Sequence, residues 1–274
     1  MYPYPVLFGK IGLYEICLAV GIVAVFFLAD RMAIKRGFSV GLQRLFVVAI
    51  PLAIFIGFGG AILFQGFYDY LETGVFKLDN TTGMTFYGGF IVGVIVFLLV
   101  WFFGAKLFKL EKESKKRFFD VTEIAACLIP LGHGFGRLGC FFVGCCHGYA
   151  TDAWYGVDMW TESGWQKVLP VQLYEAVFLF ILSAALFVCV CKMGENARRR
   201  IPLLAIYAVA YGVWRFLIEY LRGDNRGETI VSFLSPSQLT ALILIAVGIA
   251  YFCICFFVIN KRKNTNQEEF LWKE

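Results

Sequence analysis

The residue types best suited to chemistry gather between His133 and Gly148, in the stretch HGFGRLGCFFVGCCHG. Both histidines of the chain and three of its nine cysteines lie there, together with Arg137. Arg137 has no acidic neighbour in the sequence and stands where a long apolar run ends. Burying a cation in such a place costs free energy, so it marks a functional site by default. We predict that the other elements hold Arg137 at one depth.

A second set of polar residues follows a helical spacing later in the chain. Its members are four, four and three residues apart, so a helix would place them on one face: Tyr211, Arg215, Glu219 and Arg222. Glu219 can pair with either arginine and leave the other guanidinium for an anion. Arginine suits a phosphate because its planar fork donates two parallel hydrogen bonds. The alternative is a structural ion pair that packs this helix against a neighbour.

The three arginines are predicted to lie at a similar depth on the same side of the molecule. Guanidinium groups that converge near a membrane surface would form a pocket for an anionic headgroup. An acidic phospholipid fits that charge and depth better than a soluble metabolite does.

Two other patterns in this region predict no ligand. The glycines at 134, 136 and 139 match a dinucleotide-binding spacing, but no strand precedes them, so we expect no cofactor. Cys140, Cys145, Cys146 and His147 could ligate zinc, yet three adjacent ligands fit none of the usual zinc-finger spacings, so we expect no metal.

Composition indicates the scaffold that positions these residues. Of 274 residues, 59% are hydrophobic and only 16% are charged, which is typical of a polytopic membrane protein. Seven apolar stretches are each long enough to cross a bilayer as a helix, which predicts an all-α protein. They are Ile11–Ala29, Leu45–Phe64, Met84–Phe103, Phe119–Gly139, Leu169–Cys191, Ile201–Leu221 and Pro236–Asn260. The fourth contains Asp120, Glu123, Pro130 and several glycines, so we expect an interrupted segment surrounded by protein or water.

The distribution of basic residues predicts the orientation. Eighteen of the 25 lysines and arginines follow the first, third, fifth and seventh spans, so these loops are expected in the cytoplasm. The N-terminus is then outside and the C-terminus cytoplasmic, with residues 1–263 forming one transmembrane domain and 264–274 a polar cytoplasmic tail. The active region is expected in its outer half. Because topology already accounts for the basic clusters, they do not indicate nucleic-acid binding.

Several motifs together resemble those of the prolipoprotein diacylglyceryl transferase family. They occur in the family's order and span nearly the whole chain: Met84-Thr85-Phe86-Tyr87-Gly88-Gly89, Gly136-Arg137-Leu138-Gly139, Gly148, Pro170-x-Gln172-Leu173-Tyr174-Glu175, Arg215-Phe216-x-x-Glu219-x-x-Arg222 and Leu234-Ser235-Pro236-Ser237-Gln238. The seven-span topology with an outside start is also that of the family.

The resemblance implies an enzyme of the bacterial inner membrane that moves diacylglyceryl from phosphatidylglycerol to the thiol of a lipobox cysteine. Its partners would be membrane lipid and the signal peptide of a prolipoprotein. The implied catalytic residues are Arg137, Arg215, Tyr87 and His147. The implied headgroup-binding residues are Arg137, Arg215, Glu219, Arg222, Cys140, Gly148, Tyr174 and Glu175.

The sequence departs from the family where a base is expected. Cys140, Val143 and Cys145 stand where the family usually has two asparagines and a glutamate, and Tyr87 stands where it has histidine. A phenol of pKa ~10 is a poor base, so His147 or His133 is the substitute, or a cysteine acts as a covalent nucleophile. Two further alternatives are a related transferase with another acceptor and an inert phospholipid-binding protein.

Overall fold

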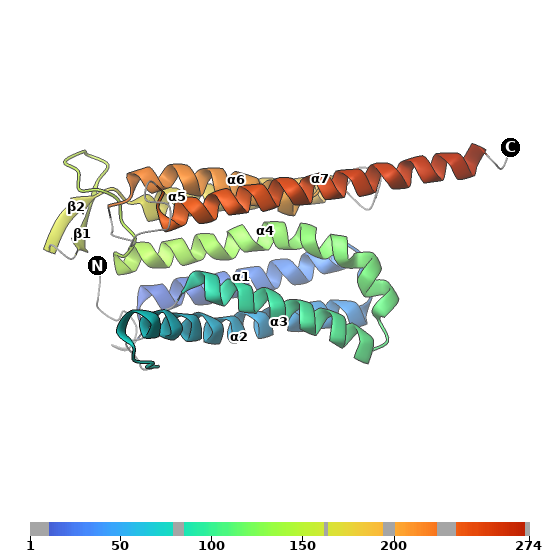
Figure 1. The fold of residues 1–274 in the computed structure, drawn as a ribbon, viewed down its shortest axis with the longest axis horizontal. Coiled ribbons are helices and arrows are strands. Elements are labelled where there is room, and N and C mark those ends of the chain that lie inside the picture. Colours follow the sequence, from blue (N-terminus) through green and yellow to red (C-terminus); the bar gives the residue numbers. More distant parts are fainter. Residues whose placement is uncertain (1–10, 79–84, 162–163, 194–200, 224–233, 272–274) are drawn as a thin grey trace. The chain divides into compact units, whose positions relative to one another are not determined.

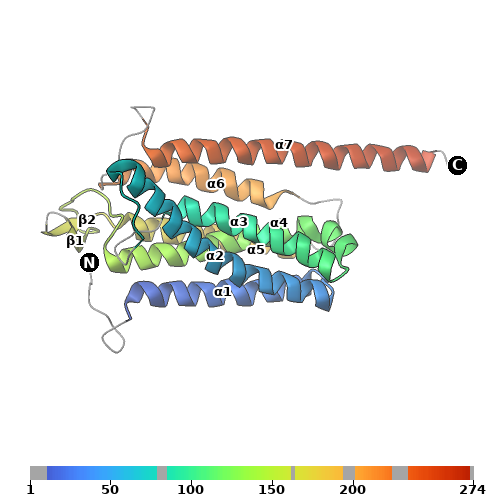
Figure 2. The same ribbon diagram turned by 60° about the horizontal axis from the view of Figure 1, so that its bottom comes forward.

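The computed structural model describes residues 11–78, 85–161, 164–193, 201–223 and 234–271. These residues form seven long helices and one small hairpin (Figure 1, Figure 2). The helices are α1 (Leu13–Lys35), α2 (Val40–Thr73), α3 (Phe86–Leu107), α4 (Glu111–Val143), α5 (Val171–Met193), α6 (Leu203–Ile218) and α7 (Pro236–Leu271). Each corresponds to one predicted span.

All seven helices are long and apolar enough to cross a membrane, which confirms the all-α polytopic fold class. Large apolar side chains point outward from them, for example Phe55 on α2 and Phe103 on α3, which are 79% and 68% exposed. In a multi-pass protein such surfaces face lipid tails. Helix α7 continues to Leu271, beyond the predicted end of the last span, so residues 264–271 extend this helix.

The predicted interruption of the fourth span is wrong, because α4 is one continuous helix from Glu111 to Val143 with Pro130 inside it. Two of its glycines, Gly134 and Gly139, serve close packing. A methyl group at Gly134 would come within 2.7 Å of the Phe180 ring, and one at Gly139 within 2.7 Å of Tyr14. A missing Cβ lets neighbouring side chains approach the α4 backbone.

The chain divides into two compact units, whose boundaries fall inside α1 and α4. The first comprises residues 1–25 and 122–274, and the second residues 26–121. In the first unit α6 lies beside α7 (Figure 1, Figure 2). The α5–α6 contact includes the rings of Phe178 and Trp214, which stack at 4.3 Å between centroids.

In the second unit α2 and α3 pack along each other through small residues. A Cβ at Gly57 would lie 2.9 Å from the carbonyl oxygen of Gly89, and one at Gly93 would lie 3.2 Å from that of Ala53. This close approach of backbones is typical of transmembrane helix pairs. At one end an aromatic cluster is buried, in which Trp101 stacks on Phe97 at 6.2 Å.

The segment between α4 and α5, predicted as a loop, contains a hairpin that the sequence did not indicate. Strand β1 (Val157–Thr161) pairs antiparallel with β2 (Gly164–Val168), with Val157 opposite Val168. Two isolated bridges extend this pairing, from Ala150 to Val168 and from Gly148 to Arg222. The second ties the segment after α4 to the segment after α6.

Candidate functional site

Arg137 pairs with an acid from another helix of the first unit. Its Nε lies 3.0 Å from Oε2 of Glu175 on α5, although the N–H is not aimed at that oxygen. The Glu175 side chain is 1% exposed and that of Arg137 is 15% exposed. The pairing places Glu175 on the buried face of α5.

The second oxygen of Glu175 connects this pair to α6. Tyr211 donates its hydroxyl hydrogen to Glu175 Oε1 at 2.9 Å, and His133 Nε2 lies 3.9 Å from the same oxygen. The rings of His133 and Tyr211 meet edge to face at 5.1 Å. Helices α4, α5 and α6 therefore join at one buried carboxylate.

The predicted stripe continues from Tyr211, but not as one α-helix. Helix α6 ends at Ile218, Glu219–Leu221 form a 3₁₀ turn (η2), and Arg222 is extended. Arg215 Nη2 lies 2.6 Å from Glu219 Oε2, and Arg222 Nε lies 3.9 Å from the same oxygen. Both arginines thus contact Glu219, and the prediction that it leaves one of them unpaired is wrong.

Gly148 fixes the backbone that carries Arg222. Its N–H donates to Leu169 O at 2.8 Å, and the next N–H, of Tyr149, donates to Leu221 O at 3.1 Å. A Cβ at Gly148 would lie 2.6 Å from Leu221 O, so only glycine fits beside the segment that contains Leu221 and Arg222. The residue's observed part is to hold the Arg222 segment in place.

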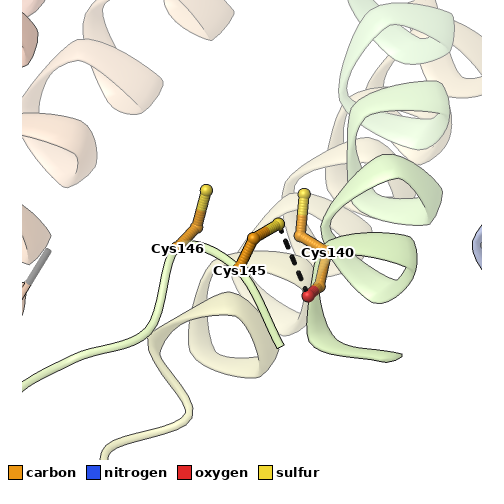
Figure 3. A group of neighbouring side chains, drawn as sticks. All are labelled: Cys140, Cys145 and Cys146. Atoms are coloured by element: carbon orange, nitrogen blue, oxygen red, sulfur yellow. Dashed lines mark hydrogen bonds between the residues drawn. The ribbon is translucent and has the colours of Figure 1, made fainter. Parts of the chain in front are cut away.

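The cysteines of the signature meet at the end of α4. The sulfur atoms of Cys140, Cys145 and Cys146 all lie within 4.8 Å of one another. Figure 3 shows the sulfurs of Cys140 and Cys146 extending the same way and that of Cys145 between them, directed at the Cys140 carbonyl, 3.7 Å away. Gln172 on α5 donates to the Cys145 carbonyl at 2.6 Å and so anchors this turn.

The pKa values of Cys145 and Cys146, which follow α4, are shifted in opposite directions. Hydrogen bonds from the thiols of Cys140 and Cys145, together with the nearby Arg222 guanidinium, lower the pKa of the Cys146 thiol. Hydrogen bonds to Cys140 and Cys146, with burial, raise the pKa of the Cys145 thiol. Arg222, which interacts with Cys146 and lies 3.9 Å from Glu219, thus connects the cysteine cluster to the charged residues that follow α6.

The other predicted residues are placed as follows. His147 is half-buried, and its Nδ1 lies 2.9 Å from the carbonyl oxygen of Gly148. Tyr174 is half-buried on α5. Tyr87 lies in the first turn of α3, but its side chain is outside the described residues.

Ser235 belongs to the network although the sequence did not single it out as a site residue. Its hydroxyl donates to Glu219 Oε1 at 2.8 Å and accepts from the Gln238 N–H at 3.1 Å. Gln238 in turn accepts from the Ser235 N–H at 3.0 Å, which completes a capping box at the start of α7. The sequence Ser235-Pro236-Ser237-Gln238, with a serine three residues before a glutamine at a helix start, is the signal that could have predicted this cap.

Seven helices long and apolar enough to cross a membrane, with arginines and glutamates buried among them, define a multi-pass membrane protein with a buried charged cluster. The prolipoprotein diacylglyceryl transferase model matches residues 5–254, and the chain belongs to that family.

Three relatives are phosphatidylglycerol–prolipoprotein diacylglyceryl transferases. That of Clostridium tetani is 33% identical over 263 residues, 91% of this chain and 97% of the relative. The Clostridium perfringens enzyme numbered 2 is 27% identical over 272 residues, which cover 95% of this chain and 96% of the relative. That of Ectopseudomonas mendocina is 28% identical, covering 91% and 94%.

Proposed function

We propose that this protein transfers the diacylglyceryl group of phosphatidylglycerol to the thiol of a lipobox cysteine in a prolipoprotein and releases glycerol phosphate. Family membership and the names of the relatives support the reaction. The observation that carries the site assignment is a pair of buried guanidinium nitrogens. Among the residues that the structure describes, Arg215 Nη1 has no hydrogen-bond acceptor, and Arg137 Nε lies 3.0 Å from Glu175 Oε2 without its N–H being aimed at that oxygen.

These donors suit the phosphate that departs from the lipid. When the bond from glyceryl carbon to phosphate oxygen breaks, the negative charge on the phosphate grows. Donors already fixed at that place stabilise the growing charge without reorganisation. Arg137 and Arg215 act as this clamp, while Glu175 and Glu219 hold them in position. Arg222, Cys140, Gly148 and Tyr174 complete the proposed headgroup site.

His147 is the proposed acceptor of the thiol proton. The Gly148 carbonyl can only accept a hydrogen bond, so Nδ1 of the neutral imidazole carries the hydrogen. Nε2 then holds a lone pair that can accept a proton. Tyr87, at the start of α3, is the second candidate for this role.

The proposed location is the bacterial inner membrane, with the N-terminus outside and the C-terminus in the cytoplasm. The excess of basic residues in alternate loops supports this orientation. It places the end of α4 and the hairpin near the outer surface, where the signal peptide of a translocated prolipoprotein presents its cysteine. The same charge pattern gives no support for a nucleic-acid partner.

The test is turnover by the purified full-length protein. With phosphatidylglycerol vesicles and a synthetic lipobox peptide, we expect a peptide whose mass increases by one diacylglyceryl group. A peptide with serine in place of cysteine is the control and should stay unmodified. Retained lipid binding without any product would instead indicate an inert phospholipid-binding protein. Product on an acceptor other than the lipobox cysteine would indicate a related transferase.

A further inference from the structure

The cysteine cluster has the composition and size of a metal site. Three sulfur atoms arranged tetrahedrally around zinc at Zn–S distances of about 2.3 Å lie about 3.8 Å from one another. The sulfurs of Cys140, Cys145 and Cys146 already lie within 4.8 Å of one another. Reaching the required spacing takes a contraction of at most about 1 Å. All nine cysteines lie in the described ranges, and none forms a disulfide.

The backbone explains how ligands adjacent in sequence converge. Helix α4 ends at Val143, and both Gly144 and Cys146 adopt positive φ, 76° and 64°. This turn folds the chain back so that two successive cysteines face the last turn of α4 (Figure 3). Sequence spacing argued against zinc because adjacent ligands usually point apart; here the turn directs them together.

The surroundings favour a divalent ion that prefers thiolates. Three thiolates with one divalent cation carry a net charge of minus one, and the Arg222 guanidinium contacts Cys146 to balance it. Soft sulfur ligands select zinc or monovalent copper over calcium or magnesium. We commit to zinc, because its three-thiolate complex has the smaller negative charge and keeps a fourth position.

We propose that Cys140, Cys145 and Cys146 bind one zinc ion, and that its fourth position receives the thiol of the acceptor cysteine. The second part rests on the proposed transferase function. Three protein ligands and one open position are typical of a catalytic zinc. His147 does not supply the fourth ligand through Nδ1, which is engaged with the Gly148 carbonyl.

The chemistry balances without a further reactant. The acceptor thiol would bind zinc as a thiolate and release its proton to water, because coordination deprotonates a thiol. The sulfur attacks the glyceryl carbon that bears the phosphate. A carbon–sulfur bond forms, and the carbon–oxygen bond breaks with its electrons moving to the phosphate oxygen. Glycerol phosphate leaves beside Arg137, one helical turn before Cys140 on α4. The neutral thioether binds zinc weakly and dissociates.

Metal content of the purified full-length protein tests the first part. After incubation with Zn²⁺ and gel filtration, we expect about one ion per chain. With Co²⁺ as the probe, we expect a sulfur-to-cobalt charge-transfer band and the intense visible bands of a tetrahedral site. Cys145→Ser should weaken both, while Cys189→Ser, which alters an exposed cysteine of α5, should not. No bound metal in reduced wild-type protein overturns the proposal.

Thiol labelling gives a readout that needs no variant. Zn²⁺ should slow alkylation of the three cluster cysteines in the wild-type protein, and a chelator should reverse this protection. Alkylation of Cys189 should be the same with and without Zn²⁺. Equal alkylation of the cluster in both conditions, or a disulfide among the three cysteines in freshly purified protein, contradicts a metal site.

The second part is tested on the Co²⁺ protein. Adding the lipobox peptide should shift the visible bands, and the serine peptide should leave them unchanged. If the visible bands do not change when the cysteine peptide is added, the cobalt site is purely structural and the acceptor role is overturned. The two proposals fail separately. Metal binding without lipid transfer refutes the proposed function, and with it the acceptor role, but leaves the zinc site standing. Lipid transfer by metal-free protein refutes the acceptor role and leaves the proposed function standing.

Discussion

Two regions of this protein bury arginine beside carboxylate, but they do so differently. In the second unit Arg117 donates to Asp120 Oδ2 at 3.4 Å and to the Gly37 carbonyl at 3.1 Å. Arg36 lies 3.7 Å from the same aspartate. In the first unit Arg137 and Arg215 also contact carboxylates. Among the described residues, however, Arg215 Nη1 has no hydrogen-bond acceptor, and the Arg137 Nε–H is not aimed at the nearby Glu175 oxygen.

The difference separates an arginine that joins helix ends from one that is ready for a ligand. Arg117 spends its donors on an acid and a backbone carbonyl, so it ties the start of α4 to the turn between α1 and α2. Leaving a charged donor buried and unmatched costs free energy, which a protein recovers when an anion binds. We therefore propose that the Arg137–Arg215 cluster of the first unit serves lipid chemistry and that the Arg36–Arg117 cluster of the second unit serves stability.

The largest expected effect is that of Arg137→Lys. Lysine keeps the positive charge beside Glu175 but loses the planar fork, so kcat/KM should fall by at least about 100-fold. Arg117→Lys is the matched control, because it makes the same change in the second unit and should leave kcat/KM nearly unaltered. Lipid-shifted peptide measured by mass spectrometry is the readout. Equal losses in the two variants would remove the distinction between the clusters.

Glu175→Gln should have the next largest effect. The amide still accepts a hydrogen bond from Tyr211, but it no longer holds Arg137 by charge, so kcat should fall about 10- to 100-fold. Asp120→Asn, the equivalent change beside Arg36 and Arg117, should lower the free energy of unfolding by about 3 kcal/mol without changing kcat per folded molecule. Thermal unfolding in detergent measures the expected loss of stability, and initial rates measure the expected loss of kcat. An Asp120→Asn enzyme with low kcat and wild-type stability would contradict the prediction.

Gly148→Ala should lower both stability and activity, because a methyl group meets the Leu221 carbonyl and displaces Arg222. Gly136→Ala is its control, since no atom of the described residues, apart from the nearby backbone of α4 itself and the two flanking residues, lies within 4 Å of the new methyl. Alanine in a helix should raise the unfolding free energy by up to about 1 kcal/mol. Loss of activity in a stable Gly136→Ala enzyme would mean that the open space beside Arg137 accommodates substrate.

Ser235→Ala should have the smallest effect. It removes the capping bond at the start of α7 and one donor to Glu219, which together cost about 1 kcal/mol of unfolding free energy. Ser235→Thr keeps the hydroxyl and should restore most of the loss. The midpoint of thermal unfolding is measured for the wild-type protein and both variants. A Ser235→Thr midpoint as low as that of Ser235→Ala would show that the geometry of the cap, and not the hydroxyl alone, determines stability.

The helices could be predicted from the sequence, but their ends and continuity could not. Lipid requires about 20 apolar residues per crossing, so composition alone located all seven. Pro130 and the glycines of α4 suggested a break, because the sequence does not show the side chains, such as Phe180 and Tyr14, that pack against those glycines. The hairpin after α4 was missed because short strands carry little periodic signal.

The sequence by itself determined the fold class and the family, and it singled out the arginines of the candidate site. Hydrophobic length and motif order can be read directly along the chain. It also gave the Arg215–Glu219 contact, which four-residue spacing on a helix dictates. Only the tertiary structure decided that Glu175 is the partner of Arg137, that Gly148 positions Arg222 and that three cysteines converge. Those contacts join residues from different elements, and their distances depend on how the helices pack and how the turn after α4 bends.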